Sequence, residues 1–133
     1  MRVLLDTNVL IAAFISKGVC HELFLHVCDQ HNLILSEYIL QELKNNLRNK
    51  FHYSEHEVQQ TINLVKERAE IVSPKEIFAY PIRDPNDQPI LAAAVTGGCH
   101  CLITGDKDLL EAPAIKKMPI LSPNQFWKFE KTA

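Results

Sequence analysis

Short runs of consecutive apolar residues recur along the chain, and longer segments with apolar residues at every third or fourth position separate them. Unbroken apolar runs of this length are typical of strands that are buried on both faces of a sheet. The predicted strands are residues 3–5, 33–35, 70–72, 101–103 and 119–121. The run at 70–72 is the weakest of them because it includes Glu70 and ends at Ser73 and Pro74.

The segments between these runs have the spacing of amphipathic helices. A helical stretch from Val9 is interrupted at Gly18 and resumes as far as Val27. Ser36 has the position of an N-cap, and Ser54 with Glu57 has capping-box spacing. The predicted apolar stripes are Ile39, Leu40, Leu43 and Leu47, then Val58, Ile62, Val65 and Ala69, then Ile90, Leu91, Ala94 and Val95. The last of these helices ends at Gly97 and Gly98, and a short helix through Phe126 and Trp127 closes the chain.

Strands that alternate with helices predict an α/β fold with a parallel sheet covered on both faces. Right-handed crossovers place the carboxyl ends of all the strands at one edge of the sheet, where ligands of such folds bind. The length of 133 residues is typical of a single domain, which we expect to span residues 1–133.

Acidic residues gather where the predicted strands end. Asp6 directly follows the first strand, and Asp106 follows the fourth strand just beyond Thr104 and Gly105. If these two strands are neighbours in the sheet, Asp6 and Asp106 lie close together. Further candidates at the same edge are Glu42 in the helix after the second strand, Asp84 and Asp87 before the helix that leads into the fourth strand, and Asp108.

Each acid also has a purely structural interpretation. Asp6 could cap the helix that follows it, and Asp84 and Asp87 could cap theirs. Asp106 could belong to a Gly-Asp turn. Glu42 could be a solvated helix residue, although it lies at the margin of an apolar stripe, where a carboxylate is costly unless it is paired. Taken together at one edge of the sheet, the acids favour a functional site.

Clustered carboxylates raise one another's pKa values, and a bound cation relieves their repulsion. Mg²⁺ and Mn²⁺ prefer such oxygen ligands. A cation held there lowers the pKa of bound water and offsets the charge that develops during phosphoryl transfer. We therefore predict metal-assisted hydrolysis, with Asp6, Asp87 and Asp106 as direct or water-mediated ligands and Glu42 as a ligand or as the group that orients the attacking water.

Composition limits the classes of protein further. The formal net charge is −2, so a nucleic-acid role would depend on a local site rather than on a basic surface. No apolar run has the length of a membrane span, and the first residues do not fit a signal peptide, so we expect a cytoplasmic protein with no membrane partner. The cysteines lack the paired spacing of zinc sites and are expected to be reduced thiols near the core: Cys20, Cys28, Cys99 and Cys101.

Four blocks in order resemble the PIN-domain family, and the end of the chain also fits that family. The blocks are residues 3–10 (VLLDTNVL), 35–43 (LSEYILQEL), 84–94 (DPNDQPILAAA) and 102–109 (LITGDKDL), and the fitting end is residues 120–126 (ILSPNQF). Each block alone is weak, whereas the four in order are specific. The resemblance covers nearly the whole chain.

The resemblance implies a three-layer α/β/α sandwich with a central, about five-stranded parallel sheet. It implies Mg²⁺- or Mn²⁺-dependent cleavage of single-stranded RNA, with Asp6, Glu42, Asp87 and Asp106 as the catalytic and metal-binding acids. The implied supporting residues are Asn8, Ser36, Asp84, Thr104 and Asp108. Small free-standing members resemble toxins of bacterial toxin–antitoxin pairs, which implies an antitoxin protein as partner and a homodimer or higher oligomer.

Other classes fit less well. A haloacid-dehalogenase-type phosphatase needs a second Asp where this chain has Asn8, and response-regulator receivers need an acidic pair that is not evident. The chain has no glycine-rich or Walker loop for nucleotides. The remaining alternative is a catalytically inactive PIN-like module that acts through a protein partner. Stabilisation by Mn²⁺ would separate an intact metal site from such a module.

Overall fold

The computed structural model of this protein describes residues 1–74 and 80–133, and a sheet of parallel strands forms its centre. The strand order is β3-β2-β1-β4-β5, and all four neighbouring pairs are parallel. The strands are β1 (Arg2–Leu5), β2 (Asn32–Ser36), β3 (Ala69–Val72), β4 (Cys101–Ile103) and β5 (Ile120–Leu121). The predicted α/β class and the predicted five-stranded parallel sheet are therefore confirmed.

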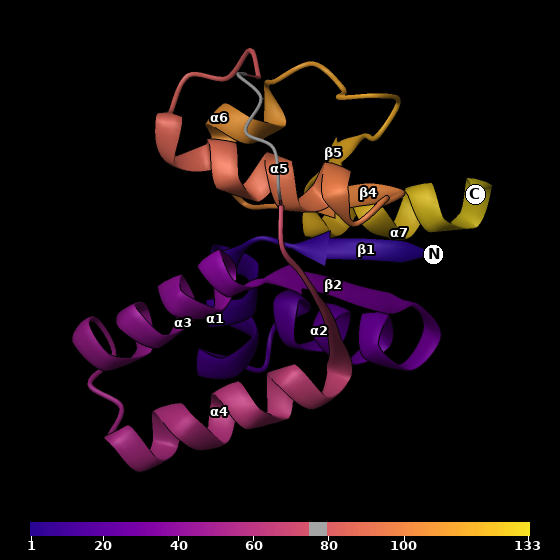
Figure 1. The fold of residues 1–133 in the computed structure, drawn as a ribbon. Helices are drawn as coiled ribbons and strands as arrows, with labels where there is room; N and C mark the ends of the chain where they lie inside the picture. The colour runs from indigo at the N-terminus through magenta and orange to yellow at the C-terminus, as the bar shows by residue number, and fades with distance from the viewer. Residues whose placement is uncertain (75–79) are drawn as a thin grey trace.

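Helices cover both faces of this sheet. They are α1 (Thr7–Ile15), α2 (Val19–Gln30), α3 (Glu37–Asn49), α4 (Glu55–Arg68), the 3₁₀ helix η1 (Pro85–Asp87), α5 (Gln88–Thr96), α6 (Lys107–Leu110) and α7 (Pro123–Thr132). Right-handed crossovers place α1 to α4 on one face and α5 on the other, which gives three layers. In Figure 1, α1 to α4 gather beside β2, whereas α5 lies beside β4.

The apolar runs form strands because both of their faces are covered. Leu4 pairs with Ile34 on one side and with Leu102 on the other, and all three side chains are fully buried. The helices begin at the predicted caps. The Ser36 hydroxyl accepts the Ile39 N–H at 3.3 Å, and Ser54 forms a complete capping box with the third residue of α4.

Four details differ from the prediction. Ala69 was expected in the fourth helix but begins β3, where it is in register with Leu33, so pairing with the sheet overrides helical spacing. Pro119 lies just outside β5, although its carbonyl still accepts the Leu102 N–H at 3.1 Å. Val95 is only half-buried, whereas the neighbouring Ala92 and Ala93 of α5 are buried. The four-residue helix α6 was not predicted, since one turn carries too little periodicity.

The four cysteines are free thiols, as expected. Cys101 is buried in β4, and Cys20, Cys28 and Cys99 are half-buried. Across residues 1–74 and 80–133, no cysteine belongs to a group of three metal-ligating side chains. In the same part of the chain no single helix is long and apolar enough to span a membrane; α1 and α2, bent by 108° at the break between them, pass on length and composition only as a pair.

Candidate active site

Asp6 occupies the position where β1 ends against β4. Its backbone N–H donates to the Ile103 carbonyl at 2.9 Å, so it continues the ladder between the two strands. Its carboxylate is 6% exposed and accepts two hydrogen bonds, from the Thr7 N–H at 2.7 Å and from the Thr104 hydroxyl at 2.8 Å. Burial raises the pKa of Asp6, and these two hydrogen bonds offset part of the rise.

Thr104 links the ends of the two central strands. It is fully buried just after β4, and its hydroxyl also accepts the Asp106 N–H at 3.0 Å. Asp106 in turn accepts the Asp108 N–H at 2.9 Å and so caps α6. A second link is the Asn8 side-chain carbonyl, which accepts the Gly105 N–H at 3.1 Å. Strands β1 and β4 are neighbours, which is the condition under which the sequence places Asp6 and Asp106 close together at one edge of the sheet.

Glu42 reaches this edge from α3. It is half-buried, and the Thr7 hydroxyl donates to its Oε1 at 2.9 Å. Burial raises the pKa of Glu42, and the charge of Asp6 raises it further. The Asn46 side chain donates to the Glu42 carbonyl at 2.8 Å, one turn further along the helix. Glu42 therefore lies at the margin of the buried stripe of α3, as the sequence indicated.

Asp84 and Asp87 come from the segment around η1. Asp84 caps η1 by accepting the Asn86 N–H at 2.9 Å. Asp87 is 8% exposed, and its Oδ2 is buried with no hydrogen-bond partner among the described residues. Burial raises the pKa of Asp87 to about 6, with further contributions from the charges of Asp106 and Asp6. A buried carboxylate oxygen without a partner is costly, and a ligand that carries positive charge would relieve that cost.

These side chains line one cavity of about 320 Å³. Its lining residues are Asp6, Thr7, Asn8, Ile11, Glu42, Asn46, Lys50, Asp84, Asn86, Asp87, Ile90 and Asp106. We call it the carboxylate cavity. All four predicted catalytic acids line it, together with the predicted supporting residues Asn8 and Asp84. Thr104 lies directly behind it and holds Asp6.

Two predicted supporting residues lie away from the cavity. Ser36 is 1% exposed and positions α3 as its N-cap. Asp108 is outside the lining, and its carboxylate lies 3.5 Å from the Arg83 guanidinium. Any support from Ser36 is therefore indirect, whereas Asp108 acts through charge, because its carboxylate raises the pKa of Asp87.

The predicted catalytic and supporting residues leave out four of the polar residues that line the cavity, which are Thr7, Asn46, Lys50 and Asn86. Thr7 directly follows Asp6, and its hydroxyl bridges to Glu42. Asn46 and Lys50 lie four and eight residues after Glu42, which places them on the same face of α3. That spacing was present in the sequence and could have identified both residues.

The donor atoms fit a hard divalent cation. The cavity offers carboxylate and amide oxygens but no histidine or cysteine, which suits Mg²⁺ or Mn²⁺. No three of these carboxylates have oxygen atoms that all lie within 4.8 Å of one another. A cation among them would therefore keep part of its water shell, as Mg²⁺ usually does in proteins. The unpartnered Oδ2 of Asp87 is the atom with most to gain from such an ion.

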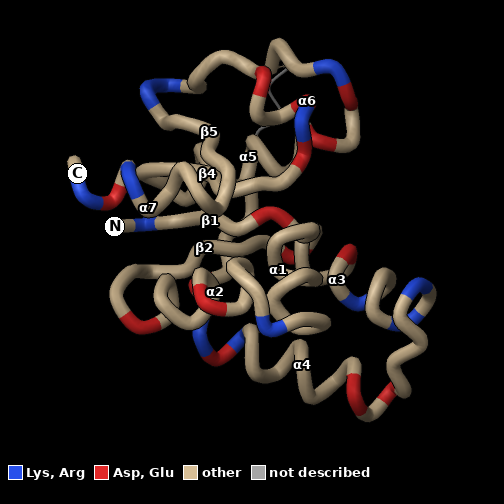
Figure 2. The backbone as a smooth tube through the Cα atoms, turned by 180° about the vertical axis from the view of Figure 1, so that it is seen from behind, with Lys and Arg blue, Asp and Glu red and all other residues tan. Residues whose placement is uncertain are grey.

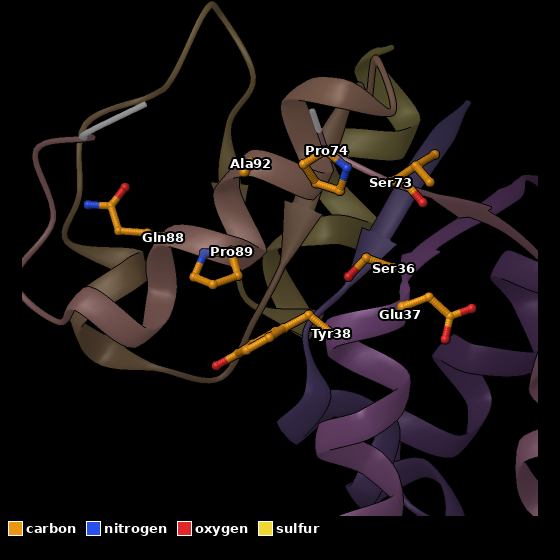
Figure 3. Close-up of a pocket in the computed structure, with 9 residues that line it drawn as sticks. Ser36, Glu37, Tyr38, Ser73, Pro74, Gln88, Pro89 and Ala92 are labelled. Carbon is orange, nitrogen blue, oxygen red and sulfur yellow. The ribbon is translucent and has the colours of Figure 1, made fainter. Parts of the chain in front are cut away.

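Figure 3 shows a second cavity, of about 310 Å³. It lies between β2, α3, the end of β3 and α5, and its lining includes Ser36, Tyr38, Pro74 and Pro89. The Tyr38 hydroxyl is 3.5 Å from the carbonyl of Asn86, a residue of the carboxylate cavity. Burial raises the pKa of Tyr38, and the charges of Glu42 and the nearby aspartates raise it further. Tyr38 therefore lines the second cavity and contacts Asn86, which lines the carboxylate cavity.

Comparison with known proteins agrees with this geometry. The family described as PIN domain matches residues 2–108, which is more than half of the chain and includes every acid described above. The chain belongs to the PIN domain family. The resemblance noted in the sequence is thereby confirmed for the family and the fold. A search among curated protein sequences finds no match.

Two solved structures share the PIN fold of this chain. One is VapBC2 from Rickettsia felis bound to a DNA fragment from their promoter, with a TM-score of 0.69, 18% identity, and 92% of this chain and 98% of that chain covered. The other is VapBC-1 from nontypeable Haemophilus influenzae, with a TM-score of 0.67, 18% identity, and 93% and 99% covered. At this identity the likeness establishes the fold, and it extends over nearly the full length of each chain.

Proposed function

We propose that this PIN domain is a Mg²⁺- or Mn²⁺-dependent endoribonuclease that cleaves single-stranded RNA at the carboxylate cavity. The observation that carries the proposal is the placement of Asp6, Glu42, Asp87 and Asp106 around one cavity at the carboxyl edge of the sheet. The pKa values of Asp6, Glu42 and Asp87 are raised, and acids with raised pKa values in a cavity are candidates for a functional site. Membership of a family of nucleases supports the same reaction class.

Asp6, Asp87 and Asp106 would hold the cation, directly or through water. When bound, the cation supplies an activated water and offsets the negative charge of the transition state. The protein's own contribution is orientation. The Thr104 hydroxyl donates to one oxygen of Asp6 at 2.8 Å, and Asp6 is only 6% exposed, so this side chain would meet its ligand with little reorganisation.

Glu42 would orient the attacking water and accept its proton. Burial raises its pKa toward the working range of a general base, and the Thr7 hydroxyl fixes one of its oxygens at 2.9 Å. Lys50 lines the same cavity and would bind a phosphate of the RNA. Figure 2 shows Lys and Arg scattered along the chain among Asp and Glu, so this local contact matters more than any broad basic surface.

The biological context that we propose is a toxin–antitoxin pair. The two similar structures are VapBC2 and VapBC-1, and this chain covers 98% and 99% of the matched chains. A PIN domain of this size would then act as the toxin, with an antitoxin protein that blocks the carboxylate cavity and with a second copy of the chain as a dimer partner. Its RNA target places the activity in the cytoplasm.

The direct test is cleavage of a mixed single-stranded RNA pool by the purified protein in Mg²⁺, Mn²⁺ or EDTA. The protein should cut in either metal and be inactive in EDTA. Asp6→Asn should abolish cutting, because the charge is lost while the shape of the side chain is kept. Asp29→Asn is the matched control, since Asp29 is exposed on α2 and does not line the cavity.

Absence of cutting by the folded protein in every metal would refute the nuclease. A protein that binds Mn²⁺ but cuts nothing would be the inactive PIN-like module, which acts through its protein partner. Capture of that partner would then become the assay of function. Unchanged cutting by Asp6→Asn would instead show that the carboxylate cavity is not the site of the reaction.

A further inference from the structure

A second cluster of metal-ligating side chains lies at the edge of the sheet opposite the carboxylate cavity. His31 immediately precedes β2, and its Nδ1 lies 3.0 Å from the Met1 amine, just before β1. Figures 1 and 2 both place the two chain termini together at the edge where β1 begins. Because the strands are parallel, the length of β1 separates the two edges by about 13 Å. The cluster is therefore independent of the carboxylate cavity.

The cluster consists of His26, His31 and Glu130. The Nε2 atoms of both histidines lie 2.5 Å from the same carboxylate oxygen, Oε2 of Glu130. One ligand atom from each side chain lies within 4.8 Å of the other two. Among residues 1–74 and 80–133, no other group of three metal-ligating side chains has ligand atoms this close together. The side chains are 30%, 10% and 25% exposed, in that order, so water reaches one side of the cluster.

Aromatic side chains hold the two imidazoles in place. The His26 ring packs against Trp127 with 4.9 Å between centroids, and the His31 ring meets the edge of Phe126 at 5.8 Å. Phe126 is fully buried. Helix α7 therefore supplies both the carboxylate and the aromatic wall, while α2 and the residue after it supply the imidazoles. Ligands fixed in this way lose little rotamer freedom when an ion binds.

We propose that His26, His31 and Glu130 bind a zinc-class divalent cation that fastens α7 to α2. Two imidazole nitrogens and one carboxylate oxygen, with water in a fourth position, form a known tetrahedral zinc set. Metal–ligand bonds of about 2.0 Å place neighbouring donors about 3.3 Å apart in such a tetrahedron. The Glu130 carboxylate thus needs to move by less than about 1 Å. The ion displaces the Nε2 protons, so each imidazole binds it as the neutral ring with one proton on Nδ1, and excess protons pass to water. At His31 this Nδ1–H faces the Met1 amine, which accepts it after giving up a proton of its own.

The donor set also determines which ion binds. Imidazole ligands favour Zn²⁺, Ni²⁺ and Cu²⁺ over Mg²⁺, whereas the carboxylate cavity offers only hard oxygen donors. The two sites therefore select different metals in one chain. Glu130 also lies outside residues 2–108, the part of the chain that matches the PIN family, so the family match does not include the complete set of three ligands.

The test is calorimetric titration of Zn²⁺ into protein that has been freed of metal with EDTA and dialysed. We expect one tight Zn²⁺ per chain, and an affinity that falls at least about tenfold in His26→Gln and in Glu130→Gln. His56→Gln is the matched control, because His56 is exposed on α4. Asp6→Asn tests for binding at the carboxylate cavity. Both controls should keep the wild-type zinc affinity.

Two further measurements complete the design. Co²⁺ replaces Zn²⁺ as a spectroscopic probe, and its spectrum should lack the charge-transfer band of a thiolate, which excludes the four cysteines as ligands. Far-UV circular dichroism in EDTA shows whether each variant is folded. His26→Gln and Glu130→Gln are made as separate proteins, so the test remains decisive if only one of them folds. Wild-type zinc affinity in either folded variant, or a thiolate band, would overturn the proposal and leave His26, His31 and Glu130 as an ion-pair clamp only.

Discussion

Asp87 should destabilise the metal-free protein, so its replacement by asparagine should stabilise it. Burial raises the pKa of Asp87 from its ordinary 3.8 to about 6, and Oδ2 has no hydrogen-bond partner among the described residues. Each pH unit of that difference corresponds to about 1.4 kcal/mol. The ionised carboxylate therefore lowers the free energy of unfolding by about 3 kcal/mol at neutral pH, and Asp87→Asn removes this penalty.

The sign of the pH dependence follows from the raised pKa. Between pH 4 and pH 6 the folded state binds more protons at Asp87 than the unfolded state, so the stability of the wild-type protein falls as pH rises through this window. The advantage of Asp87→Asn should grow from about 1 kcal/mol at pH 4.5 to about 3 kcal/mol at pH 7.5. Well below pH 3.8 the carboxyl is protonated in both states and the advantage disappears.

Urea unfolding in EDTA, followed by the fluorescence of the single tryptophan Trp127, measures this difference at both pH values. Asp29→Asn is the control and should change stability little at either pH, because Asp29 is exposed. Adding Mn²⁺ should stabilise the wild-type protein more than Asp87→Asn, because the ion binds only the folded site. An Asp87→Asn protein that is less stable at pH 7.5, or an advantage that does not change with pH, would refute the reasoning.

Three other substitutions test the packing and the site. Gly97→Ala should lower the free energy of unfolding by about 2 kcal/mol, because a Cβ atom there would lie 2.7 Å from a methyl carbon of Ile34; urea unfolding measures it. Thr104→Val should cost about 2 kcal/mol and most of the RNA cleavage, because the buried Asp6 carboxylate loses its hydroxyl donor. Lys50→Gln should weaken RNA binding and reduce by about 0.7 the slope of log affinity against log salt, as expected for one lost phosphate contact to a single strand.

Each of these substitutions has a matched control. Gly18→Ala should be nearly neutral, since the nearest atom to a new Cβ is 3.7 Å away. Thr61→Val removes a hydroxyl that bonds only to a carbonyl one turn back in α4, so it should leave cleavage unchanged. Lys44→Gln also removes one lysine charge, but Lys44 does not line the carboxylate cavity. A variant that behaves like its control would contradict the role assigned to the residue.

Much of the fold was predictable because local signals and burial agree. Leu4, Ile34 and Leu102 lie in unbroken apolar runs, and burial on both faces of the sheet requires such runs. The caps at Ser36 and Ser54 were recognisable because their bonding partners lie three residues away. Where tertiary pairing competes with local spacing, as at Ala69, the sequence prediction was wrong.

The candidate site was predictable for a topological reason. In a parallel sheet every residue that follows a strand reaches the same edge, so Asp6 and Asp106 could be assigned to one edge without coordinates. Their closeness depended on whether β1 and β4 are neighbours, which the sequence left open. The exact surroundings of each acid could not be inferred. The lack of a partner at Asp87 Oδ2 and the bridge from Thr7 to Glu42 depend on side-chain packing between elements.

The histidine cluster shows what sequence reasoning misses. His26 and His31 are five residues apart, and Glu130 follows 99 residues after His31, so no short motif connects them. Only the packing of α7 against α2 brings the three side chains together. The same packing could not be inferred from helical periodicity, because periodicity indicates which face of a helix is buried but not which neighbour covers it.

The most direct test of the carboxylate cavity as a metal centre is anomalous diffraction from crystals grown with Mn²⁺. The account predicts an anomalous peak in the cavity, in contact with carboxylate oxygens of Asp6, Asp87 or Asp106 or with waters that these residues hold. The peak should be absent from crystals of Asp6→Asn grown in the same way. A wild-type crystal with no Mn²⁺ in this cavity, or with Mn²⁺ only at His26, His31 and Glu130, would contradict the central claim.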